Sequence, residues 1–251
     1  MPPWLAAGVW GGVAGSALLI GAAIGYFARV PQRGIAAIMA FGGGVLVSAL
    51  SFDLVDEAYR ESGAWIAGGG FLAGAAIFTL GTVALNHRGA RHRKRSGRQQ
   101  PSEHQQPGSG LVLALGALID GIPESIAIGV SLIAGGAVSA VAVAAVFLSN
   151  VPEGLSSAAG MRQAGRSKAY VFVVWGVIAL ASALASLAGY VVFSGLPREA
   201  IAVTIAIAGG AILAMLADTM MPEAYEHAHD ATGIITVAGF LIAFLLSKLQ
   251  G

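Results

Sequence analysis

Long apolar runs, separated by short polar stretches, make up most of this chain. A helix needs about 20 mostly apolar residues to cross a bilayer, and eight such segments follow one another along the sequence. We expect these helices at Trp4–Ala28, Gly34–Ala58, Ala64–Leu85, Gly110–Ala134, Ala137–Ala159, Ala169–Phe193, Ala200–Tyr225 and Gly233–Leu246. The pattern therefore predicts an all-α, polytopic membrane protein, with eight transmembrane helices in a single domain over residues 1–251.

The one long polar stretch, Asn86–Ser109, contains R-H-R-K-R and no apolar run. We expect it to be a basic, disordered loop between the third and fourth helices. Loops alternate sides in an eight-helix chain, and 11 of the 14 lysines and arginines then fall on the side of this loop. Cytoplasmic loops carry the excess of lysine and arginine. We therefore expect loop 86–109 in the cytoplasm and both termini on the extracytoplasmic side of the plasma membrane.

Composition agrees with a membrane class. The chain is 56% hydrophobic and only 11% charged, whereas a soluble domain carries about 25% charged residues. Cysteine is absent, which excludes disulfides, thiolate metal sites and cysteine nucleophiles. The 36 glycines indicate close helix packing. The expected partners are lipid and a second copy of the chain in a homodimer, and nothing here indicates nucleic acid.

An internal repeat relates the second and seventh predicted helices. Glu57-Ala58-Tyr59 aligns with Glu223-Ala224-Tyr225, and the glycine pairs that precede these motifs coincide in the same register. Because the two helices run in opposite directions through the membrane, we expect an inverted repeat of three, two and three helices, a common design of transporters. The alternative is a chance resemblance between two helices rich in glycine and alanine.

Carboxylates lie inside these apolar helices without a basic partner. Asp120 and Glu124 fall in the fourth helix, Glu153 in the fifth and Asp218 in the seventh. A carboxylate at this depth costs several kcal/mol unless it is paired, solvated or bound to a cation. Since no predicted helix interior holds a lysine or arginine, protons, water or metal cations must neutralise these groups.

Spacing places these groups on common helix faces. Asp120 and Glu124 are one turn apart, as are Ser149 and Glu153. Each pair also encloses a proline, which frees a backbone carbonyl four residues earlier. A freed carbonyl at membrane depth is tolerated where it lines a wet cavity or binds a cation. The pattern therefore predicts an oxygen-rich cation site, although a proline alone also fits an ordinary kink.

The paired x-x-P-E motifs, the P-E-A-Y-E-H end of the seventh helix and the basic, histidine-bearing loop resemble the ZIP (Zrt/Irt-like) family over essentially the whole chain. That family typically carries H-N-x-P-E in helices four and five, which build a binuclear metal site. The resemblance implies transport of divalent metal ions, with the metal as substrate rather than cofactor. It places the metal site at Asp120, Glu124, Ser149, Asn150 and Glu153.

The chain departs from this family pattern at both histidines. Asp120 and Ser149 stand in their places, and Gly121 replaces an asparagine. Ser182 stands where many members have a glutamate in the sixth helix. We therefore expect one working metal position and a degenerate second site at Gly121 and Ser182. Oxygen ligands suit manganese and iron, and zinc also accepts carboxylates.

Two peripheral clusters fit a path for the ion. The cytoplasmic end of the seventh helix offers an exit-side metal relay, for which a solvated helix end is the alternative. Its residues are Glu223, Glu226, His227 and His229. Asp53 and Asp56 would lie at the entrance, where like charges attract cations, although a hydrated loop edge would look the same.

Two other functions stay open at this stage. A relative that has lost transport could act as a metal sensor or receptor, given the missing histidines. An intramembrane aspartyl hydrolase could pair Asp120 with Asp218. No nucleophile elbow, glycine–aspartate motif or H-E-x-x-H motif is present, so we do not expect an enzyme.

Overall fold

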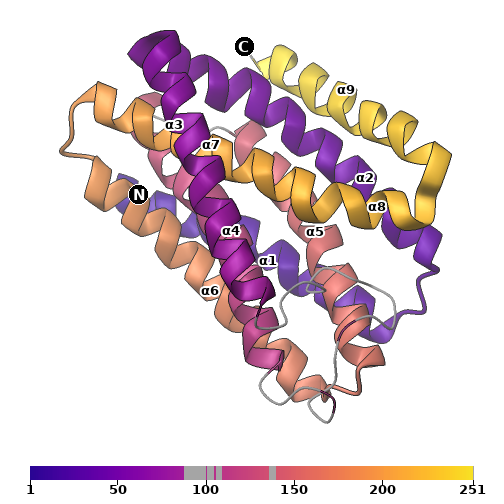
Figure 1. The fold of residues 1–251 in the computed structure, drawn as a ribbon. Coiled ribbons are helices and arrows are strands. Elements are labelled where there is room, and N and C mark those ends of the chain that lie inside the picture. The colour runs from indigo at the N-terminus through magenta and orange to yellow at the C-terminus, as the bar shows by residue number, and fades with distance from the viewer. Residues whose placement is uncertain (88–99, 101–104, 106–108, 136–139, 251) are drawn as a thin grey trace.

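The computed structural model describes residues 1–87, 100, 105, 109–135 and 140–250, and every regular element in this part of the chain is helical. Most of the predicted loop 86–109 lies outside the described residues. The elements are α1 (Pro3–Phe27), α2 (Gln32–Ala49), the π-helical turn η1 (Leu50–Leu54), α3 (Val55–Asn86), α4 (Ser109–Gly135), α5 (Ala140–Gln163), α6 (Lys168–Phe193), α7 (Arg198–Met215), the π-helical turn η3 (Leu216–Met220), α8 (Met221–Ala228), the 3-10 turn η4 (His229–Ala231) and α9 (Thr232–Gln250). Figure 1 shows the long helices packed side by side as one bundle.

Two helical runs are much longer than a bilayer requires, because each contains a corner. The run from α2 through α3 is interrupted at Gly63, whose backbone angles are φ 76° and ψ 169°. Glycine adopts a positive φ without the steric penalty of a Cβ. The run from α7 through α9 turns at His229, with φ 44° and ψ −123°. The sequence predicted polar gaps at both places, and the structure makes each turn with fewer residues than predicted.

Five helical runs among the described residues are long and apolar enough to cross a membrane. They are Pro3–Phe27, Gln32–Asn86, Val112–Ile133, Lys168–Phe193 and Arg198–Leu249. Their outer surfaces expose large apolar side chains, such as Trp65 at 94% and Leu80 at 71%. Soluble monomers rarely expose extended apolar patches. These features define a multi-pass membrane protein.

Glycines allow the closest contacts between helices. α1 packs against α5 and α6, α4 against α6, α2 against α9, and α3 against α7. At Gly44 of α2, an added Cβ would collide with the backbone carbonyl of Thr236 in α9. At Gly210 of α7, it would collide with the carbonyl of Phe71 in α3. Small residues of this kind let helix backbones approach each other in membranes.

A single apolar core joins the helices that carry the candidate site. Leu50 of η1, Ile128 of α4, Val146 of α5 and Leu216 of η3 are all buried in one cluster. The polar residues of α4 and α5 therefore sit in a packed, low-dielectric surrounding, where the charge of an ion has a large effect.

Candidate cation-binding site

Asp120 and Glu124 of α4 are both buried, each only 1% exposed. α4 stays helical through Pro123, so the two carboxylates keep the spacing of one helical turn that the sequence predicted. Burial of two acidic groups one turn apart raises the energy of their charged forms unless positive charge or solvent compensates. The pair is thus well suited to hold a cation.

α5 supplies one buried carboxylate and two hydrogen-bonded neighbours. Glu153 is 4% exposed. The Ser149 hydroxyl donates to the carbonyl of Val146 at 2.9 Å, and the Asn150 amide donates to the carbonyl of Ala14 in α1 at 2.9 Å. These bonds fix Ser149 to its own helix and Asn150 to α1. In this conformation Glu153 is the strongest candidate ligand of α5.

The two residues of the predicted degenerate second metal site, Gly121 and Ser182, lie close together in the structure. An ideal Cβ on Gly121 of α4 would lie 3.7 Å from the Ser182 hydroxyl of α6. Ser182 is buried. A glycine and a serine thus face each other where a second metal would need charged ligands. The expectation of a single working metal position rests on the lack of a charged ligand at these two residues.

A small cavity is lined both by Asp53, which was predicted to lie at the entrance, and by the buried Glu124. Its volume is about 20 Å³, and its lining includes Asp53, Glu124, Leu50, Ile128 and Val146. This is room for about one water-sized particle. The Oδ2 atom of Asp53 is buried and has no hydrogen-bond partner among the described residues. Two carboxylates from different helices therefore border one apolar cavity.

Asp56, the other predicted entrance residue, has a different environment. Its carboxylate lies 2.7 Å from the guanidinium of Arg60, and both side chains are substantially exposed. It is not among the residues that line the cavity of Asp53. Asp56 thus belongs to a surface ion pair, which contributes little stability.

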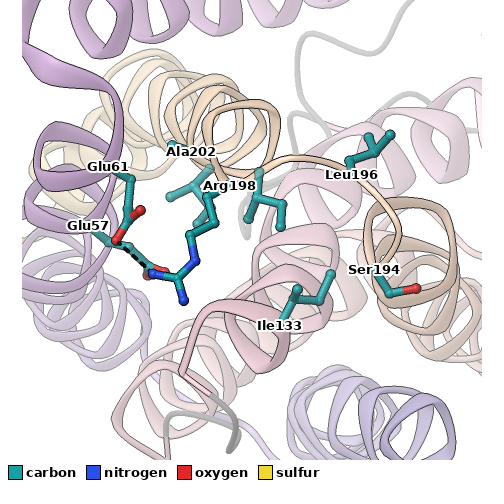
Figure 2. A pocket seen from close by; sticks show the side chains of 9 residues that line it. Glu57, Glu61, Ile133, Ser194, Leu196, Arg198 and Ala202 are labelled. Carbon is teal, nitrogen blue, oxygen red and sulfur yellow. Dashed lines mark ion pairs between the residues drawn. The ribbon is translucent and has the colours of Figure 1, made fainter.

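A second, larger cavity lies where α3, α4 and α7 meet, and it contains an acidic residue that the sequence analysis did not select. Its volume is about 220 Å³, and Glu57, Glu61, Arg198 and Ser194 are among its lining residues. Figure 2 shows Arg198 extending toward the two glutamates. Its guanidinium lies 4.0 Å from Glu61. The signal for Glu61 was present in the sequence, since Asp53, Glu57 and Glu61 repeat every four residues.

The predicted exit cluster is only partly assembled. Glu223 of α8 is 1% exposed and accepts a hydrogen bond from the Ser156 hydroxyl of α5 at 3.4 Å. Close by along α5, the carbonyl of Ser157 accepts a bond from the Gln100 amide at 3.2 Å. His229 is exposed and contacts the Tyr225 ring edge-on. Glu226 and His227 are half-buried.

Within the described part of the chain, no group of three or more histidine, aspartate or glutamate side chains is arranged to hold a metal ion. Asp120, Glu124 and Glu153 are all buried, but they do not form a ready-made three-ligand cluster. Asp218, the remaining predicted intramembrane carboxylate, lies in η3 and is exposed. The metal site therefore stays a prediction that requires the side chains to rearrange around an ion.

Fold and composition define the class of the protein as a helical, multi-pass membrane protein. No protein-family model matches the chain. A search of curated proteins likewise finds no match.

Proposed function

We propose that the chain is a ZIP-type transporter that carries divalent metal cations across the membrane. The observation that supports this most strongly is the burial of Asp120, Glu124 and Glu153 inside the bundle. α4 contains no lysine or arginine, and the one basic residue of α5, Arg162, lies in its last turn. Buried carboxylates of this kind favour binding of a desolvated cation, and a transported metal ion is such a cation.

The proposal includes eight membrane-spanning arms. It counts the two arms of α3 separately at Gly63 and ends the seventh arm at His229, so that the five long apolar runs and α5 correspond to eight proposed spans. The π-helical turns support an inverted repeat, because Leu50 and Leu216 begin them at equivalent positions relative to Glu57 and Glu223.

Packing partners give independent support to the repeat. In the proposed repeat, α1 is equivalent to α6, and α5 is equivalent to α4. The packing of α1 against α5 should then be matched by packing of α6 against α4, and the structure has both contacts. Likewise, α2 is equivalent to α7, and α9 is equivalent to α3. The packing of α2 against α9 should be matched by packing of α7 against α3, and the structure again has both contacts. Related halves of this kind allow a bundle to open alternately toward either side.

Basic residues favour a cytoplasmic location for the end of the bundle where α1, α5 and α8 finish. Arg162 donates to the carbonyl of Tyr26 at 2.7 Å, at the end of α1. Lys168 lies over the ring of Phe27, 5.0 Å from its centre. This end also carries Arg29 in the connection from α1 to α2, and Arg33 in the first turn of α2. We infer that both termini lie on the extracytoplasmic side.

The chemistry of the site favours hard or borderline cations. Glu124, Glu153, Asp120 and Asp53 offer only oxygen donors, which suit manganese and iron, while zinc stays possible. The cavity that Asp53 and Glu124 share admits about one water-sized particle. An ion that reaches Glu124 from Asp53 must therefore shed most of its water and draw the neighbouring carboxylates around itself.

The two rival functions draw less support. Asp120 is buried whereas Asp218 is exposed, which gives no support to an aspartyl dyad that shares a proton. A metal sensor would use the same carboxylates without moving the ion, and only a transport measurement separates it from a carrier. Homodimer formation stays a prediction.

The test is metal uptake into proteoliposomes that contain the purified full chain. We expect uptake of at least one of zinc, manganese or iron, and its loss in the double variant Asp120→Asn with Glu124→Gln. Asp56→Asn is the matched control, because that carboxylate lies in an exposed ion pair. Absence of uptake for all divalent metals, with intact folding, would exclude transport and favour a sensor.

A further inference from the structure

The cavity between α3, α4 and α7 has a size and charge that suit a hydrated cation. A divalent ion that keeps six waters needs roughly 60–90 Å³, taking about 10–15 Å³ of cavity volume for each water. The cavity offers about 220 Å³. Glu57 and Glu61 from α3 border it on one side, and Ile133 of α4 borders it on another (Figure 2).

A resident positive charge already occupies this space. Arg198, at the start of α7, lines the cavity and reaches toward α3, where its guanidinium lies 4.0 Å from the Glu61 carboxylate (Figure 2). The side chains are 86% and 39% exposed, respectively. An ion pair this long and this exposed is weak, so a divalent cation can displace it.

The carboxylates of this cavity continue toward the centre of the bundle. Glu61, Glu57 and Asp53 follow one another at intervals of four residues, which places them along one helix face. Glu57 and Glu61 line the large cavity, whereas Asp53 lines the small one with Glu124. The step from the large cavity to the small one is therefore where an ion would lose its water.

We propose that Arg198 is a tethered competitor of the transported cation. It pairs with the Glu61 carboxylate while no ion is in the outer cavity, and a hydrated divalent ion must displace it to enter. The direction of ion movement in this proposal, from outside to inside, rests on the proposed function. The proposal adds a residue that sets the apparent affinity for the cation. Arg198 acts through Glu61 and touches no dehydrated ion, so it is a positioning residue.

The experiment measures binding of Mn²⁺ alone to the purified full chain in nanodiscs of zwitterionic lipid. Because the sequence has no cysteine, Gly195→Cys gives a single site for a nitroxide spin label. Gly195 lies between the lining residues Ser194 and Leu196, and a Cβ there would meet open space. Mn²⁺ in the cavity should broaden the nitroxide spectrum through its unpaired electrons.

We expect Arg198→Gln to lower the Mn²⁺ concentration for half-maximal broadening by about two- to fivefold, the scale of one exposed charge pair. Arg198→Lys should stay near wild type. Arg60→Gln is the matched control, since Arg60 also carries an exposed ion pair to a carboxylate of α3 but does not line this cavity. The double variant Glu57→Gln with Glu61→Gln should abolish the saturable broadening.

Equal shifts in Arg198→Gln and Arg60→Gln would overturn the proposal, because they would indicate a general change in surface charge. Broadening that survives in the double glutamate variant would also overturn it. All variants are compared again in the Asp120→Asn, Glu124→Gln background, which lacks the central carboxylates. An unchanged Arg198 effect in this background upholds the proposal even if uptake measurements reject transport, so the two failures are distinguishable.

Discussion

Asp53 of η1 and Glu124 of α4 border the same small cavity, although one was predicted at the outer mouth and the other at the centre of the membrane. Their helices meet in the apolar core around Leu50 and Ile128. No other polar residue among those described lines this cavity, so in the proposed transporter an ion that left Asp53 would next meet Glu124.

Replacing Asp53 with asparagine should weaken metal uptake strongly. Removing one of the two carboxylates that border a low-dielectric cavity weakens binding of a divalent cation there by at least about 1.4 kcal/mol, or about tenfold in half-saturating concentration. The measurement is uptake against metal concentration in proteoliposomes. Asp56→Asn should change it less than about twofold, because surface ion pairs contribute little. Similar losses in both variants would assign the effect to general surface charge.

Adding a methyl group at Gly44 or Gly210 should destabilise the bundle by similar amounts. Each Cβ would collide with a backbone carbonyl, of Thr236 or of Phe71, and overpacking of this kind costs about 1–3 kcal/mol. Thermal unfolding of the purified alanine variants in detergent measures the effect. Gly68→Ala is the control, since a Cβ there meets nothing within 4 Å, and it should unfold at or above the wild-type temperature.

Replacing His229 with glycine should stabilise the fold. His229 has φ 44° and ψ −123°, a conformation that costs a residue with a side chain about 1 kcal/mol or more and that glycine adopts freely. His227→Gly should instead lower the unfolding temperature, because His227 lies in the last turn of α8 and glycine weakens a helix by about 1 kcal/mol. Destabilisation in both variants would mean that the His229 side chain supports the turn through contacts.

Single cysteines test the orientation of the chain. A cysteine at Ser96, within the basic loop, should be protected from an impermeant thiol reagent in intact cells and become labelled after permeabilisation. A cysteine at Gly195, between α6 and α7, should be labelled in intact cells. The absence of native cysteine keeps the background low. The reverse pattern would invert the predicted topology.

The sequence was sufficient to predict most helices, because an apolar run of membrane length has few other stable forms in lipid. The predicted Ala169–Phe193 and the observed α6, Lys168–Phe193, differ by one residue at one end. The corner at Gly63 was less predictable, since Arg60 and Glu61 read as loop residues but continue the helix of α3. Polar residues near a bilayer surface can belong either to a helix end or to a loop.

Pairings between helices could be anticipated only in part. The four-residue spacing predicted that Asp120 and Glu124 share a face, and both are buried. The cavity that joins Asp53 to Glu124 depends on how η1 lies against α4, which no local pattern encodes. Likewise, Asn150 was expected as a ligand, and its bond to the Ala14 carbonyl depends on the distant helix α1.

The wide turn η1 has a consequence for insertions and deletions. A π-helical turn holds one residue more than an α-helical turn, so the chain from Leu50 to Leu54 contains a residue that a regular helix would omit. Forcing the same residues into a regular α-helix would rotate everything beyond the turn by about 100°, and Glu57 and Glu61 would then turn away from Arg198. Deleting one residue from the turn would instead leave the faces of α3 where they are, because the wide turn already absorbs the extra residue. The η1 turn is therefore a place where this helical run tolerates the loss of one residue, and the same reasoning holds for η3.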